Sequence, residues 1–149
     1  MMTIPTPRRQ PLLTGAALTL ALFAAGCQDG KILAPATRIY AADLAGKAKA
    51  CTVPAVQLAD AKPAAADMTI GNDGGWCGIS LTQGSRRPYA AGLVQTRANH
   101  GQVYIHTVGD ETRVDYTPDA NFAGKDTFAI RLLPGNAILN VAVTVAPHS

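Results

Sequence analysis

Alternation of apolar residues with small or polar ones near the C-terminus restricts the fold of this chain more than any other feature. In residues 138–145, every second side chain is Leu or Val, and Asn, Ala and Thr stand between them. This period of two places one set on each face of a β-strand, with one face buried. Residues 127–133 repeat the pattern, and the turn signal Pro134-Gly135-Asn136 separates the two runs. We therefore predict a β-hairpin over residues 127–145.

The region from residue 51 onward consists of short β-branched runs separated by Gly, Pro, Asn and Asp. Regular short runs of this kind are typical of an all-β sandwich or barrel. The chain has 149 residues, which leaves room for one such core once an N-terminal segment is removed. We expect strands at residues 53–58, 68–70, 76–82, 90–96, 102–108, 112–117, 127–133 and 138–145.

The N-terminus has the three parts of an export signal: cations at Arg8 and Arg9, an apolar run over residues 12–25, and small residues before Cys27. The run is shorter than the roughly 20 residues that cross a bilayer, so we expect a cleaved signal rather than a membrane span. The paired arginines leave both the general secretory route and the twin-arginine route open. Residues 27–50 are rich in Ala and are expected to form a flexible tether ahead of a domain at residues 51–149.

The sequence Leu-Phe-Ala-Ala-Gly-Cys at residues 22–27 resembles the lipobox of bacterial lipoproteins. In that family the cysteine is acylated and becomes the N-terminus, which implies a signal peptide at residues 1–26 and a lipid anchor on Cys27. Two or three acyl chains hold a protein stably on a membrane. The next residue is Gln28 rather than Asp, which in this family favours the outer membrane over the inner one. Cleavage after Ala24 that leaves Cys27 as a free thiol is the alternative.

The charge of the chain gives no support to nucleic-acid binding. Lys and Arg number 13 against 10 Asp and Glu, and removal of Arg8 and Arg9 with the signal leaves 11 against 10. A nearly neutral domain without a basic stripe lacks the positive surface charge that binds a phosphate backbone.

Cys51 and Cys77 remain as an even pair once Cys27 is assigned to the anchor. In an oxidising compartment such a pair is expected to form a disulfide. Two separate buried thiols are the alternative.

The C-terminal half resembles the bacterial Ig-like and cadherin-like repeats of surface adhesins. The resemblance is carried by Ala-Asn-His-Gly-Gln-Val at residues 98–103, by residues 114–128 with their Tyr-Thr-Pro and Phe-Ala-Gly-Lys-Asp-Thr-Phe segments, and by the Val/Thr run at residues 141–145. It implies an Ig-like Greek-key β-sandwich of about seven strands. The chain holds one copy rather than a tandem array, so we expect the fold to carry over more readily than adhesion.

Several matched residues have physical roles of their own. We expect the ring of Tyr116 in the core with its hydroxyl on a backbone partner, similar to the tyrosine corner of sandwiches. Phe122 and Phe128 are expected to fill the space between the sheets. Gly124 is expected to take a positive φ, and Asp126 to hydrogen-bond turn amides before the final hairpin.

The spacing of the histidines and carboxylates gives little support to a zinc or calcium site. His100, His106 and His148 are not spaced as zinc ligands, so we expect surface histidines and no metal or other cofactor. A calcium site would need carboxylates that converge, and we expect solvated turn carboxylates instead. The carboxylates considered for it are Asp115, Asp119 and Asp126.

Catalysis is not expected either. Ser80 and Ser85 lack a nucleophile elbow, and no Gly-rich phosphate loop opens a helix. A hydrolase would require His106, Asp115 and a serine to meet in one cleft.

The expected function is therefore binding. We predict a non-enzymatic envelope lipoprotein whose Ig-like domain contacts another protein or a cell-wall glycan. The alternative is a small periplasmic inhibitor or accessory subunit that inserts the loop around Trp76 into a partner. Trp76 can equally pack against the disulfide in the core. Arg86, Arg87 and Tyr89 lie in a predicted loop. This loop could contact an acidic partner or lipid headgroups, and the alternative is that it is only solvated.

Overall fold

The computed structural model describes residues 39–84 and 86–147, and over this range the chain is almost entirely β-structure. The predicted signal and Cys27 lie outside the described residues. No helix among the described residues is long and apolar enough to span a membrane. The elements are a short 3₁₀ helix η1 (Ala41–Leu44) and strands β1 (Cys51–Thr52), β2 (Pro63–Gly71), β3 (Cys77–Leu81), β4 (Ala91–Thr96), β5 (Gly101–Val108), β6 (Glu111–Pro118), β7 (Gly124–Leu133) and β8 (Ala137–Ala146).

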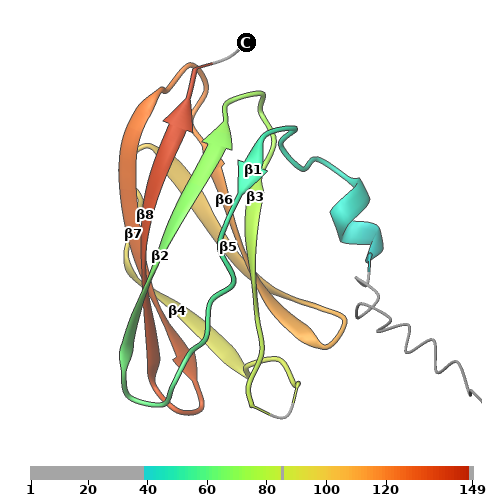
Figure 1. The fold of residues 1–149 in the computed structure, drawn as a ribbon, viewed down its shortest axis with the longest axis vertical. Coiled ribbons are helices and arrows are strands. Elements are labelled where there is room, and N and C mark those ends of the chain that lie inside the picture. Colours follow the sequence, from blue (N-terminus) through green and yellow to red (C-terminus); the bar gives the residue numbers. More distant parts are fainter. Residues whose placement is uncertain (1–38, 85, 148–149) are drawn as a thin grey trace, which may run out of the picture. The chain divides into compact units, whose positions relative to one another are not determined.

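Two sheets face one another (Figure 1). One has the order β1-β2-β8-β7-β4 and the other the order β3-β6-β5. All neighbours are antiparallel except β2 and β8, which run parallel over the whole of β2. The placement of β3, β6 and β5 in one sheet and of β4, β7 and β8 in the other is that of an Ig-type sandwich. The expected fold class is confirmed, with a two-residue strand β1 in addition to seven longer ones.

The core consists of the inward set of each alternating strand. In β8 the four predicted aliphatic side chains are at most 3% exposed, whereas the residues between them face solvent. Tyr116 and Phe128 are among the largest fully buried side chains, and their rings stack at a centroid distance of 5.9 Å. The predicted hairpin is confirmed as β7–β8, and Gly135 and Asn136 supply the positive φ angles of its turn.

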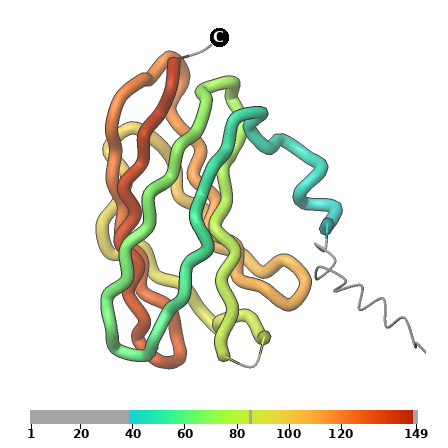
Figure 2. Tube along the Cα trace, in the orientation of Figure 1, coloured from blue at the N-terminus to red at the C-terminus, as the bar shows by residue number. Residues whose placement is uncertain are grey.

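The strand predicted at residues 53–58 is wrong. These residues run along the sandwich in an extended path without joining either sheet (Figure 2). Val53, Val56 and Leu58 still pack against the core, which explains the apolar pattern. Pro54 has no N–H to donate to a ladder, and this favours an unpaired strand-like segment. The predicted strand at 68–70, by contrast, is longer than expected and begins at Pro63.

Contacts with the sandwich begin before residue 51, within the segment expected to be a tether. Ala48 is 4% exposed, and its N–H donates to the carbonyl of Trp76 at 2.8 Å. The N–H of Trp76 in turn donates to the carbonyl of Gly46 at 2.9 Å. The backbones come so close that a Cβ on Gly75 would lie 2.4 Å from the nitrogen of Ala48. The glycine at position 75 therefore permits residues 46–48 to add to the edge of the domain.

The predicted disulfide between Cys51 and Cys77 is confirmed, with a Cα–Cα distance of 5.4 Å. It joins β1 of one sheet to β3 of the other across 26 positions of sequence.

Replacement of both cysteines by serine is expected to lower the free energy of unfolding by about 3 kcal/mol, because the open chain gains loop entropy in the unfolded state. Urea denaturation of the oxidised parent and of the double variant measures this difference. The expectation fails if the double variant unfolds at the same urea concentration as the parent.

Candidate functional site

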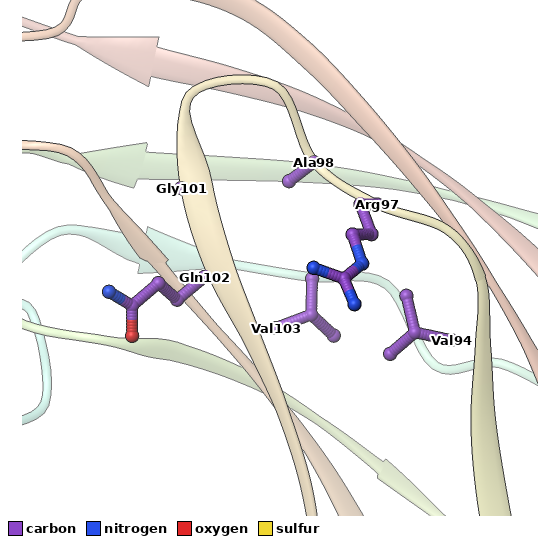
Figure 3. Close-up of a pocket in the computed structure, with 6 residues that line it drawn as sticks. All are labelled: Val94, Arg97, Ala98, Gly101, Gln102 and Val103. Carbon is purple, nitrogen blue, oxygen red and sulfur yellow. The ribbon is translucent and has the colours of Figure 1, made fainter.

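A groove lies between the edges of β4 and β5, each of which is the last strand of its sheet on this side among the residues that the structure describes. Its volume is about 420 Å³, and its lining comes from the two strands and the loop that joins them. The lining residues are Val94, Arg97, Ala98, Gly101, Gln102 and Val103 (Figure 3).

β4 and β5 approach closely at one point next to the groove. At Gly92 a Cβ would lie 2.6 Å from Ile105, so the edges meet where position 92 has no side chain. Past this point the pairing of β4 with β7 shifts register between Val94 and Thr96. Such a bulge bends the strand locally, and here it leaves the space between the two edges unfilled.

The groove combines an apolar wall with one cation. Val94 pairs with the fully buried Ile130 and so belongs to the inward face, yet it is 40% exposed. Figure 3 shows Val94, Val103 and Arg97 directed into the same space, with Gln102 directed away. Arg97 is exposed and has no ion-pair partner among the described residues. The arrangement suits an extended segment that carries an apolar side chain and an acidic group.

The loop at the end of the groove is fixed by Asp126, which is 4% exposed. Its carboxylate accepts hydrogen bonds from the N–H groups of Asn99 at 2.9 Å and His100 at 2.8 Å, and from the hydroxyl of Tyr116 at 3.0 Å. Burial alone would raise the pKa of Asp126, but these amides outweigh burial and lower it. The same hydroxyl of Tyr116 reaches the carbonyl of His100 at 3.1 Å, as predicted for a tyrosine corner. Both predicted roles are confirmed, as is the positive φ of Gly124.

A second polar cluster lies on the outer face of the three-stranded sheet. Arg113 donates to Asp43 at 2.6 Å, and Asp115 contacts His106 at 2.8 Å. Both β6 residues are 7% exposed. Burial raises the pKa of Asp115, whereas the hydrogen bond from Arg113 lowers the pKa of Asp43.

The residues predicted from sequence to contact a partner do not share one environment in the structure. Trp76 is half-buried, with its ring 5.7 Å from the guanidinium of Arg113 and its Nε1 donating to the carbonyl of Ala45 at 2.9 Å. Arg86 and Arg87 lie exposed in the turn after β3. Tyr89 corrects the prediction: it is 7% exposed and belongs to the core, because the chain turns inward as it approaches β4.

Phe122 also differs from its predicted core position. It is only partly buried, at the margin of the core, and its ring stacks on the exposed His100 at a centroid distance of 4.2 Å. Phe128 alone of the two predicted phenylalanines lies fully between the sheets.

The described residues considered for calcium or catalysis do not converge on one site, and Ser85 and His148 lie outside the described residues. Asp115 faces His106 on the outer side of its sheet, while Asp126 is committed to the loop amides. Among residues 39–84 and 86–147, no group of three or more His, Cys, Asp or Glu could hold a metal ion. The structure does bring His106 beside Asp115, but Ser80 pairs with Arg113 on β6, and His106 pairs with Arg113 from the other side. Ser80 and His106 are thus two strand spacings apart, about 10 Å.

Sequence reasoning missed Arg97, Arg113 and Asp43. The alternation of β6 places Arg113 on the face opposite Val114, so the sequence pattern could have indicated a charged side chain on the outer face of this strand. Asp43 meets it across 70 residues of sequence, and no local pattern reveals such a pair.

Comparison with known proteins assigns no family: no family model matches the chain, and no curated protein matches it. The fold and the site together define the class as an Ig-type β-sandwich with a groove between two free strand edges.

Proposed function

We propose that this chain is a lipid-anchored bacterial envelope protein whose sandwich binds an extended segment of a partner protein in the groove between β4 and β5. The observation that carries the proposal is the groove itself: two unpaired strand edges flank inward-facing apolar side chains that remain partly exposed. A free edge offers unpaired N–H and C=O groups to an added strand. Variable-type Ig domains build further strands onto this same edge of the sheet that holds β4, β7 and β8.

The chemistry of the lining favours a peptide over a cell-wall glycan. Sugar rings are commonly held against an aromatic face, and the lining contains no aromatic residue. Arg97 adds a positive charge at the mouth of the groove, which favours an acidic residue in the bound segment. The resemblance to adhesin repeats is consistent with a binding role on the cell envelope, without naming the partner.

The change Val94→Glu is expected to abolish partner binding, because it introduces a charge into the apolar wall. Leu93→Glu is the matched control, since Leu93 is the preceding residue, is 52% exposed and does not line the groove. A photo-crosslinking amino acid at position 102 in intact cells reports the occupant, because Gln102 is exposed beside the groove and belongs neither to its apolar wall nor to its cation. We expect one crosslinked protein that persists in the Leu93→Glu background and disappears in the Val94→Glu background.

Two results would contradict the groove as the binding site. One is a crosslink of equal yield in both backgrounds. The other is crosslinking to glycan strands without a protein, which would favour the cell-wall alternative. A probe at the exposed Asp67 on the outer face of β2 serves as a negative control for random collisions.

The anchor has its own test. Mass spectrometry of the mature protein should find an N-terminus at Cys27 with the added mass of acyl chains, and Cys27→Ser should release the protein from membranes. A mature N-terminus upstream of Cys27 with an unmodified thiol would remove the anchor from the proposal.

The accessory-subunit alternative gains no specific support. It requires Trp76 to enter a partner's cleft, whereas this side chain is half-buried and bonded to Ala45.

A further inference from the structure

A separate site lies beneath the N-terminal segment of the domain, and it does not depend on the groove between β4 and β5. Residues 40–45, here termed the strap, include η1 and lie beside the three-stranded sheet (Figure 1). We propose that the strap is a releasable cover over a carboxylate-binding site, in which Arg113 is the binding residue and Asp43 occupies the place of a carboxylate from a partner protein.

Arg113 has the features of an anion-binding residue held in a fixed position. It is 7% exposed, and its guanidinium lies 5.7 Å from the centre of the Trp76 ring. Asp43 engages only Nη1, and Nε is buried without a hydrogen-bond partner among the described residues. A carboxylate that accepted from two guanidinium nitrogens would bind Arg113 more strongly than Asp43 does. Asp43 is therefore a ligand that another carboxylate can replace.

The strap is held by polar contacts and by one aromatic side chain, because Tyr40 is half-buried and its ring packs closely against Gly109. No residue of η1 is buried, and Leu44 is 79% exposed. Besides the bond from Arg113, the hydroxyl of Tyr40 donates to Asp110, and the carbonyl of Ala45 accepts from Trp76. Water replaces these partners when the strap lifts, so the net free energy of each bond is much smaller than its strength in an apolar medium. Apart from the ring of Tyr40, release of the strap therefore exposes little buried apolar surface.

The residues that follow the strap are fixed in place. Gly46 and Ala48 exchange backbone hydrogen bonds with Trp76, and Cys51 is covalently joined to Cys77. The strap can thus detach about this point while the sandwich stays intact. A tethered ligand also has a high effective concentration. Small free carboxylates will not displace Asp43, whereas a protein partner that adds further contacts will.

The test uses the full chain, with a synthetic peptide of the strap, residues 40–45, as the probe. The double variant Tyr40→Phe/Asp43→Asn weakens the strap, and Trp76, the only tryptophan, reports occupancy through its fluorescence. We expect the peptide to bind the double variant at least about tenfold more tightly than the parent, in which the site is already occupied. Addition of Arg113→Gln to the double variant should abolish binding, and the single variant Asp67→Asn should behave like the parent.

Specificity for the carboxylate is tested with the same peptide carrying Asp43→Asn, which should not bind. Equal affinity of the Asp and Asn peptides, or equal affinity of the parent and the double variant, overturns the proposal. So does absence of peptide binding to a double variant whose thermal unfolding matches that of the parent. Hydrogen exchange in the unmodified chain gives an independent measurement, in which amides of residues 41–45 should exchange at least about tenfold faster than those of β6. Equal protection would show that the strap does not release.

Discussion

Phe128→Ala lowers the free energy of unfolding by about 3–5 kcal/mol, because truncation of a fully buried phenylalanine loses its transfer free energy and leaves a cavity. Phe128 is 2% exposed and stacks on Tyr116 at the centre of the sandwich. The strands around it are held in two ladders, so the surrounding backbone cannot collapse freely into the space. Chemical denaturation monitored by circular dichroism measures the change.

Phe122→Ala is the matched control for this prediction. It removes the same atoms from a ring that is partly exposed and that stacks on the surface residue His100. We expect a clearly smaller loss of stability than for Phe128→Ala, since less surface is withdrawn from water by that ring. A loss at position 122 that equals the loss at position 128 would contradict the assignment of Phe128 to the core and Phe122 to its margin.

Asp126→Ala is expected to cost about 3–5 kcal/mol, because several donors lose their acceptor at once and each unsatisfied buried donor costs about 1–3 kcal/mol. The donors are the amides of Asn99, His100 and Thr127 and the hydroxyl of Tyr116. The loop that closes the groove should also loosen, with faster hydrogen exchange at residues 99 and 100. Asp119→Ala, at an exposed position nearby, should change stability by less than about 0.5 kcal/mol.

The same carboxylate predicts how stability responds to acid. The pKa of Asp126 is lowered from 3.8 in the folded protein, so its contribution is fully present above that value and is lost as the pH falls below it. Asp43 acts in the same direction, whereas Asp115, whose pKa is raised, acts in the opposite one. Asp126→Ala should therefore flatten the loss of stability below pH 3.8 in denaturation curves. An unchanged acid response would contradict this role.

Local sequence signals predicted the C-terminal hairpin, but not the first five residues of β2, although that strand also has one buried face. The alternation in β7 and β8 and the turn signal between them predicted a hairpin that the register confirms. The strand predicted at residues 53–58 is absent, because apolar side chains pack on the core there although the backbone joins no ladder. Side-chain burial and strand pairing are separate requirements, and the pattern of apolar residues reports only the first of them.

The sites were harder to predict than the fold because they depend on pairs distant in sequence. Tyr116 and Asp126 could be assigned roles because a resemblance and a turn pattern marked them. The groove depends on a bulge at Val94 and on the close approach at Gly92, neither of which has a distinctive local signature. The burial of Arg113 under Asp43 depends on a segment whose own composition indicates a tether.

The cross-link between Cys51 and Cys77 also determines how the domain bears mechanical load. Tension on the chain ahead of residue 51 would first peel away residues 40–45, whose few polar contacts break one at a time. It would then break the backbone hydrogen bonds of Gly46 and Ala48 to Trp76 and reach β1, which has only two residues paired with β2 and would offer little resistance alone. The covalent bond instead passes the force directly into β3, and from there across β6 to β5. A pull at this end is thus carried by the sheet that forms one wall of the groove, and the parallel ladder of β2 and β8 is spared.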